Sequence, residues 1–214
     1  ISHASERIVE LEAQESGLLE KLAVHAELLS QHRKQASVAL AAAVERELDD
    51  LNMAGAKFAV DIHLQPDKKG LLLADGSRSA FDETGIDRVE FLIAPNLGEG
   101  LKPLVKIASG GETSRLMLAL KKTLIEADSI PTLIFDEIDQ GIGGRVGDIV
   151  GRKLWGLAAE ADHQVIVVTH LPQLAGYGDA HFHVSKAVAA GRTTTHVDAL
   201  DKTGRVRELA AMLG

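Results

Sequence analysis

Apolar residues recur at alternating spacings of three and four over the first fifty positions, as at the a and d positions of a coiled coil. Ile8, Leu11, Leu18, Leu22 and Leu29 follow this spacing, and Glu15, His25 and His32 occupy the other positions, so the seam is imperfect. Residues 1–51 contain no proline and one glycine. The pattern predicts one long helix, or a helix pair, whose first part lacks a partner in this chain and whose last part packs on a domain. An ordinary amphipathic surface helix is the alternative.

Beyond Gly55 the pattern changes to an alternation of apolar and polar residues, which is typical of half-buried strands. It predicts strands over 58–64 and 88–94 that pair in antiparallel fashion across a polar, turn-rich segment. Asp75-Gly76 within that segment is a hairpin-turn signal. Its basic residues offer an edge for DNA, with an ordinary solvated surface as the alternative; they are Lys68, Lys69, Arg78 and Arg88.

Two continuous apolar runs, 131–135 and 164–169, predict central strands that are covered on both faces. A helical pattern over about 145–160 separates them, so we expect a parallel pair with a right-handed crossover. A helix over about 113–127 should precede the pair. After it we expect a short helix over 171–177. A hairpin about residues 189–192 and a helix over 206–213 complete the predicted α/β fold.

Composition narrows the class of protein. The 214 residues suffice for one sizeable core with an appended element, and no cysteine is present, which excludes disulfides and thiolate metal sites and suits a reducing cytosol. No run of 18 apolar residues predicts a membrane span. The chain begins with Ile1, and we expect a fragment of a longer protein. Because the net charge is −8, binding to nucleic acid requires a local basic patch.

The stretch Ser109-Gly110-Gly111-Glu112 reads as a turn that opens a helix. Ser109 is a suitable N-cap, and the two glycines let the backbone approach a ligand closely. Because a helix N-terminus presents unpaired N–H groups and partial positive charge, the stretch is a candidate phosphate site. An ordinary capped helix after a loop is the alternative.

Acidic side chains follow the first apolar run, and a histidine follows the second. Asp136, Glu137 and Asp139 come after one strand and His170 after the other. Parallel strands bring such residues to one sheet edge, where ligands of open α/β sheets bind. One carboxylate can hold Mg²⁺ and its neighbour can position or deprotonate a water. The alternatives are an acidic loop that only ends a strand and a structural histidine.

The order and spacing of these four pieces resemble the head of an ABC-type ATPase. Ser109-Gly110-Gly111-Glu112 is similar to the signature motif, the strand ending in Asp136-Glu137 to Walker B with its glutamate, Asp139 to the D-loop and His170 to the switch histidine. More narrowly, the chain resembles the RecN family of bacterial SMC-like DNA repair ATPases in the amino-acid sequence of residues 105–115, 135–144 and 168–175.

This resemblance implies the C-terminal lobe of an ABC-type head: a mixed sheet with parallel core strands flanked by helices, preceded by a long coiled-coil-type helix. It implies an arm over 1–51 and the head over 52–214. The family's Walker A loop has the pattern Gly-x-x-x-x-Gly-Lys-Ser/Thr, and no Gly-Lys dipeptide occurs here. We therefore expect the N-terminal half of the same head as a partner, and poor ATP binding with essentially no hydrolysis by this chain alone.

The resemblance also implies ATP and Mg²⁺ as cofactors and roles for three residues within one subunit. Asp136 would hold Mg²⁺, mainly through water. Glu137 would orient and polarise the attacking water. His170 would contact the γ-phosphate of the nucleotide bound by its own subunit.

Further residues would act on the opposite subunit in an ATP-dependent homodimer of heads. Ser109 and Gly111, within the stretch completed by Gly110 and Glu112, would contact the γ-phosphate bound there. Asp139 would lie across the dimer interface and sense the partner site. The family implies a cytoplasmic, nucleoid-associated protein that acts on double-stranded DNA ends, with no membrane partner.

Two other classes stay open. Another SMC-like chromosome protein or a transporter subunit would keep the ABC head, although the coiled-coil pattern argues against a transporter. A non-enzymatic α/β binding module would use the acidic strand end only to coordinate a cation. That module predicts no ATPase activity even when the N-terminal half is supplied.

Overall fold

The computed structural model describes residues 2–107, 109–125, 130–161, 163–189 and 192–214. The chain forms two compact units, which we describe separately. The first contains residues 1–43, 57–94 and 100–104, and the second contains residues 44–56, 95–99 and 105–214. The sequence-based division at residue 51 into an arm and a head stays a proposal.

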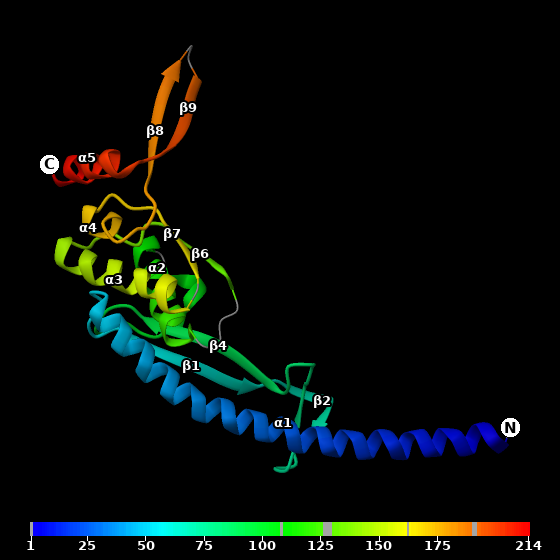
Figure 1. Ribbon diagram of the computed structural model, residues 1–214. Helices are drawn as coiled ribbons and strands as arrows, with labels where there is room; N and C mark the ends of the chain where they lie inside the picture. The colour runs from blue at the N-terminus through cyan, green and yellow to red at the C-terminus, as the bar shows by residue number, and fades with distance from the viewer. Residues whose placement is uncertain (1, 108, 126–129, 162, 190–191) are drawn as a thin grey trace. The chain divides into compact units, whose positions relative to one another are not determined.

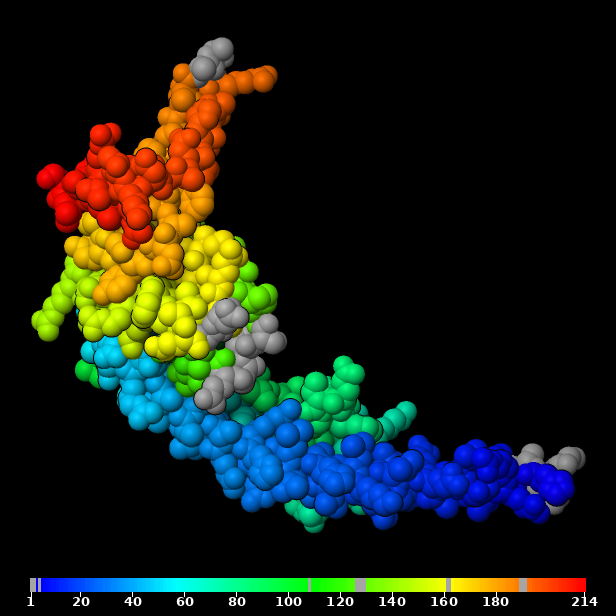
Figure 2. All heavy atoms as spheres, viewed as in Figure 1, coloured from blue at the N-terminus to red at the C-terminus, as the bar shows by residue number. Residues whose placement is uncertain are grey.

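Helix α1 (Ser2–Asp50) is a single helix, which confirms the first alternative of the sequence pattern. Its coiled-coil-type leucines and isoleucine are 40–65% exposed. In the space-filling view, the dark-blue first part of α1 is bare (Figure 2). The first unit instead buries a neighbouring stripe of small residues, Ala23, Ala26 and Ser30. Most of the apolar seam of α1 is therefore exposed, although Leu29 lies beside Gly85 of the same unit.

The last turns of α1 belong to the second unit and are buried there. Val44, Leu48 and Leu51 have no exposed surface. The helix ends in a Schellman-type arrangement, in which the Met53 backbone N–H donates to the Leu48 carbonyl at 3.0 Å. Asn52 supplies the left-handed residue that this ending needs, with φ of 61°. The expected packing of the lower helix is confirmed.

The first unit is built on an antiparallel sheet in the order β1-β4-β5. β1 (Lys57–Leu64) pairs with β4 (Asp87–Ala94) along its whole length, from Lys57 opposite Ala94 to Leu64 opposite Asp87. This pair confirms the two alternating strands of the sequence. The short edge strand β5 (Lys102–Pro103) was not predicted, because two residues carry no periodic signal.

The segment between β1 and β4 is more regular than the sequence predicted. It contains β2 (Pro66–Leu72) and β3 (Arg78–Ser79), which pair in antiparallel fashion about the expected turn. Gly76 adopts a φ of 82°, and its N–H donates to the Leu73 carbonyl. A small core forms where this hairpin packs on α1; its buried residues are Ala26, Leu71, Leu73 and Ile86.

The second unit contains the parallel pair β6 (Thr132–Phe135) and β7 (Gln164–Val167), joined through α3 (Gly144–Ala161). The expected parallel pairing of the two strands is confirmed, and Figure 1 shows them beside each other. The expectation that both faces are covered is wrong for this chain. Leu133 and Phe135 are buried, whereas Ile134 is 68% exposed and Ile166 is 45% exposed. Helices of this unit cover one face, and no described residue covers the other.

Two helical elements precede this pair in the chain, the 3₁₀ turn η1 (Leu104–Lys106) and α2 (Gly110–Thr123). The short helix α4 (Pro172–Ala175) follows it. The predicted end of the helix near residue 127 lies outside the described residues. β8 (Phe182–Ala189) and β9 (Arg192–Ala199) form the expected hairpin, and part of its predicted turn also lies outside. α5 (Lys202–Leu213) begins earlier than predicted, because the Asp201 side chain caps it.

In the described part of the chain, no helix combines the length and apolarity that crossing a membrane requires.

Candidate functional site

The first turn of α2 has the cap that the sequence predicted. Ser109 lies in the extended region with φ of −97°, and its hydroxyl accepts a hydrogen bond from the Glu112 N–H at 3.4 Å. The Ser109 carbonyl accepts from the Thr113 N–H at 3.0 Å. Glu112 adds a negative charge to the first turn, which the helix dipole favours. Both the anion-site and the ordinary-cap interpretations require this local geometry.

Two side chains of α2 connect it to the loop after β6. The Ser114 hydroxyl donates to the Asp136 carbonyl at 2.6 Å, and the Arg115 guanidinium donates to the Gln140 carbonyl at 2.8 Å. These bonds bring the Ser-Gly-Gly stretch and the acidic loop into one place. Sequence reasoning singled out neither Ser114 nor Gln140, and only their positions beside the two motifs could have indicated them.

Arg115 is buried, with 6% of its surface exposed. Burial lowers the pKa of its guanidinium, and the nearby Glu112 carboxylate works in the opposite direction. Its Nε atom has no hydrogen-bond partner among the described residues. Arg115 is therefore an internal connection between α2 and the acidic loop, whereas Lys106, the other cation beside the motif, is exposed.

The glycine pair is where the backbone approaches the acidic loop. A Cβ atom on Gly111 would lie 2.9 Å from the Gln140 Cβ and 3.0 Å from the Gln140 carbonyl oxygen, too close for any other residue. Gly111 N–H donates to Gln140 Oε1 at 3.3 Å. A Cβ on Gly110 would collide with the Glu137 carboxylate. The start of α2 is therefore half-covered by its own chain rather than fully open, and a phosphate bound there would displace these two side chains.

The acidic residues after β6 form a tight turn with an unusual backbone. Glu137 has φ of 56°, a left-handed conformation that costs a residue with a Cβ about 1–2 kcal/mol. Its N–H donates to Asp136 Oδ1 at 2.9 Å. Both side chains are exposed, at the carboxyl end of β6. Strained residues cluster at functional sites, so this outlier supports a functional role for Glu137 as a hypothesis.

Asp139, by contrast, is buried and contacts the segment after β7. Its Oδ2 accepts hydrogen bonds from the Thr169 hydroxyl at 2.6 Å and from the His170 N–H at 2.8 Å. The same oxygen lies 3.0 Å from His170 Nδ1. The carboxyl ends of β6 and β7 thus meet at one edge, as the sequence predicted. The predicted interface role of Asp139 stays a prediction, and its 4% exposure gives that role no support.

Few of the described side chains are placed to bind the Mg²⁺ that the resemblance implies. Among the described residues, no group of three His, Cys, Asp or Glu side chains is placed to hold an ion. Asp136 is a single exposed carboxylate with one oxygen already accepting from the backbone. That is compatible with Mg²⁺, which keeps several waters and takes one or two carboxylates together with substrate phosphates.

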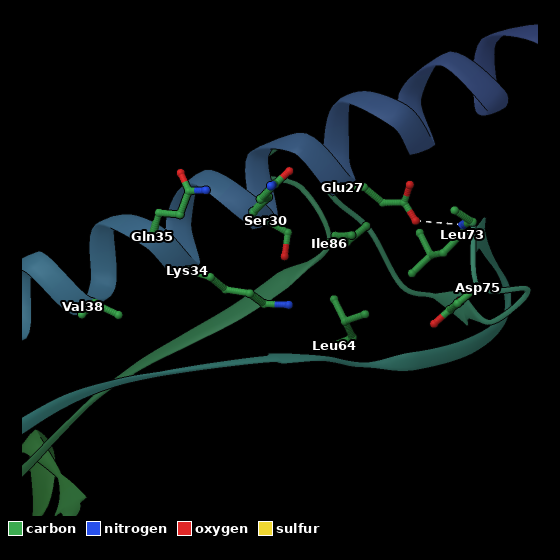
Figure 3. A pocket seen from close by; sticks show the side chains of 11 residues that line it. Glu27, Ser30, Lys34, Gln35, Val38, Leu64, Leu73, Asp75 and Ile86 are labelled. Carbon is green, nitrogen blue, oxygen red and sulfur yellow. Dashed lines mark hydrogen bonds between the residues drawn. The ribbon is translucent and has the colours of Figure 1, made fainter.

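A separate hollow lies in the first unit, between α1 and the β2–β3 hairpin (Figure 3). Leu64, Leu73 and Ile86 line it together with Asp75, and the Lys34 side chain points into it from α1 (Figure 3). Glu27 accepts a hydrogen bond there from the Ala74 N–H at 2.8 Å. It contains none of the sequence-predicted site residues, so the candidate site is the edge formed by α2, β6 and β7.

Two of the four basic residues suggested as an edge for DNA bind other residues of the first unit. Arg88 pairs with Asp82 at 2.8 Å, and Arg78 donates to the Gly70 carbonyl at 2.8 Å. Lys68 and Lys69 are exposed. The structure therefore favours a solvated, locally paired surface here.

Comparison with known proteins shows the family to which the chain belongs. No family model matches it. It is 42% identical over 189 residues to the DNA repair protein RecN of Xylella fastidiosa strain Temecula1, covering 88% of this chain and 32% of that protein. It is 37% identical over 213 residues to RecN of Halalkalibacterium halodurans, covering all of this chain and 36% of that protein. The chain belongs to the RecN family. It spans about a third of the length of these curated relatives.

The fold agrees with that assignment. The chain resembles the Smc head domain with an extended coiled coil from Pyrococcus furiosus, solved bound to the C-terminal domain of ScpA. The TM-score is 0.55 at 17% identity, and the match covers 97% of this chain and 46% of that one. At this identity the likeness shows the fold alone: a mixed α/β head portion with a long helix, as the motifs implied.

Proposed function

We propose that this RecN family chain is the C-terminal portion of an SMC-like ATPase head that acts in DNA double-strand break repair and recombination. In the whole protein, ATP would drive dimerisation of two heads, and hydrolysis would be coupled to DNA binding. The observation that carries this proposal is the convergence of three motifs on one edge. Direct hydrogen bonds join α2 to the loop after β6, and that loop to His170.

Within its own subunit, the edge offers three side chains for phosphoryl transfer. The Glu137 carboxylate, exposed on a strained turn, would orient and polarise the attacking water. Asp136 would hold Mg²⁺ through water, and the ion would neutralise charge on the phosphates. His170, whose side chain is 74% exposed, would hydrogen-bond to the γ-phosphate. Such positioning and charge stabilisation supply most of the catalysis in phosphoryl transfer.

The start of α2 would serve a nucleotide bound to a second head. Ser109 and Gly111, with Gly110 and Glu112 beside them, lie where a helix N-terminus favours an anion. In this structure the Gly111 N–H donates to the side-chain oxygen of Gln140. Binding in trans would therefore exchange Gln140 for a phosphate oxygen at that N–H, and the Glu137 carboxylate would leave its place against Gly110.

The remaining part of the same head is the first partner that we propose. No Gly-Lys dipeptide occurs in the chain, so the Walker A loop must come from outside it. The exposed face of the parallel pair, with Ile134, Ile166 and Val168, is an apolar surface that such a partner would cover. This chain alone would then bind ATP poorly and hydrolyse essentially none.

The other proposed partners are a second head in a homodimer and double-stranded DNA ends. A DNA repair role would place the protein in the cytoplasm at the nucleoid. The name of the relatives, DNA repair protein, and their 37–42% identity support the process. They do not identify the DNA structure.

The test is to co-express the missing N-terminal half with this chain and to measure ATP hydrolysis with and without linear double-stranded DNA. We expect hydrolysis that DNA stimulates. Glu137→Gln should lower turnover about 10³-fold while ATP-bound dimers accumulate. Glu90→Gln, which changes an exposed glutamate on β4, is the matched control and should leave hydrolysis unchanged. Normal turnover of the Glu137 variant would remove that residue from the role, and an inactive reconstituted pair would favour the binding-module alternative.

A further inference from the structure

Asp139 concentrates three contacts on a single carboxylate oxygen. Oδ2 accepts from the Thr169 hydroxyl at 2.6 Å and from the His170 backbone N–H at 2.8 Å, and it lies 3.0 Å from His170 Nδ1. The Asp139 side chain is only 5% exposed. A buried carboxylate with three partners on one oxygen is tightly fixed, because moving it would leave several polar groups unpaired.

The same contacts fix the imidazole of His170. The Oδ2–Nδ1 distance is that of an ion pair, and the negative charge of the carboxylate favours a proton on Nδ1. In the neutral ring Nε2 is then an acceptor, and in the cation it is a donor. The His170 side chain is 74% exposed, so the ring stays accessible while one nitrogen is held from the protein side. A partner at one ring nitrogen commonly sets the tautomer and orientation at the other.

The backbone around His170 is held as well. Thr169 donates its hydroxyl to Asp139 and accepts from the Leu171 N–H at 3.0 Å. This pair of bonds defines the turn between β7 and α4, which starts at Pro172. Both the ring and the backbone of residue 170 are therefore positioned by Asp139, directly and through Thr169.

We propose that Asp139 is a positioning residue, which holds the Nδ1–H of His170 and turns the ring so that Nε2 faces the γ-phosphate, to which the protonated ring donates through Nε2–H. The assignment differs from a sensor across the dimer interface, because the carboxylate is used within its own chain. It rests on the proposed function for the role of Nε2, whereas the tautomer itself can be measured in this chain without nucleotide.

The first experiment measures the tautomer of His170 by ¹⁵N NMR of the histidine-labelled chain. In the unsubstituted chain we expect the Nδ1–H form. In Asp139→Asn the share of that form should fall, because a neutral amide holds the N–H less strongly and can also present an N–H of its own. Asp61→Asn is the matched control, since Asp61 lies 3.0 Å from His63 Nδ1 but is exposed. An unchanged His170 tautomer in Asp139→Asn would overturn the proposal.

The second experiment uses the reconstituted protein and a double-mutant cycle. Asp139→Asn should lower kcat about 10–100-fold, as loss of an orienting partner typically does, with a smaller change in KM for ATP. In a His170→Gln background, the same substitution should change kcat by no more than about twofold, because Asp139 acts through His170. Equal losses in both backgrounds would contradict the proposal.

A third variant guards against misfolding of the Asp139 substitution. Thr169→Val removes one donor to Asp139 and leaves both members of the pair in place. We expect it to shift the tautomer and kcat in the same direction, but less. If the reconstituted protein shows no ATPase activity at all, the proposed function fails while the tautomer measurement still decides whether Asp139 positions His170.

Discussion

Asn52 and Glu137 are the non-glycine residues that the described part of the chain holds at positive φ. Asn52 ends α1, where a left-handed residue lets the Met53 N–H reach the Leu48 carbonyl. Glu137 has no helix to end. Its conformation turns the chain sharply after β6 and places its carboxylate against Gly110. The same backbone geometry thus has a structural cause at one residue and supports a functional hypothesis at the other.

The cause assigned to Asn52 predicts a simple substitution result. Asn52→Ala should lower the free energy of unfolding by about 1–2 kcal/mol, because a Cβ without a compensating polar side chain is unfavourable at positive φ. Asn52→Gly should be within about 0.5 kcal/mol of the native chain, since glycine adopts this conformation readily. Urea unfolding of the two variants checks this, and equal losses for both would contradict it.

At the scale of elements, the end of α1 is attached to α3 by Lys153. Its Nζ lies 2.6 Å from a Glu47 carboxylate oxygen and 2.9 Å from one of Asp50. Burial opposes the charge on Lys153, but the hydrogen bonds to the two carboxylates outweigh it, so the pKa is raised above 10.5. These two ion pairs connect the last turns of α1 to α3.

This raised pKa predicts a pH dependence with a definite sign. The stabilisation should be fully present below pH 10.5 and should be lost as pH rises through the folded-state pKa. Unfolding free energy measured by urea should therefore fall more steeply above pH 10.5 in the native chain than in Lys153→Met. A double-mutant cycle with Glu47→Gln should give a coupling of about 0.5–3 kcal/mol. Lys202→Met, at an exposed lysine, should retain the native pH profile.

At the scale of the whole molecule, the second unit leaves two apolar surfaces uncovered by its described residues. One is the face of β6 and β7 with Ile134, and the other is a face of the β8–β9 hairpin with Val184 and Val197, at least 59% exposed. An isolated two-stranded hairpin is marginal in water. Contiguous apolar surfaces of this kind mark contacts with other protein segments.

These surfaces predict a different response of the chain alone and of the co-expressed pair. Ile134→Lys should change the unfolding free energy of this chain by less than about 0.5 kcal/mol, since the side chain is already exposed. With the N-terminal half present, the same variant should weaken co-purification and lower Tm, because binding stabilises the folded state. Val38→Lys, on α1 and 73% exposed, is the control. Normal assembly of the Ile134 variant would exclude this face as the contact.

Local periodicity predicted most elements because it reports on neighbours in the chain. Alternation placed β1 and β4 correctly, and heptad spacing placed α1. It failed at β5, which is too short for a pattern. It also misjudged Ile134, since an apolar residue reads as buried whether its cover lies in this chain or outside it.

The candidate site shows the same division. The residues at its edge were found from motif order, and Ser109 as a cap follows from its place before the helix. Gln140 and Thr169 were missed, because polar residues beside a motif resemble ordinary loop residues. Their roles depend on contacts with Gly111 and Asp139, which lie 29 and 30 positions away in the chain.

The sequence by itself determined the order of most elements, the cap of α2 and the family resemblance, because these depend on spacing along the chain. Only the tertiary structure decided that Asp139 is buried against His170 and that Gln140 and Glu137 cover the glycine pair. Those facts depend on which carboxyl ends and helix starts are brought together in space. A carboxylate has the same sequence signal whether it faces solvent or a histidine, and the fold supplies the difference.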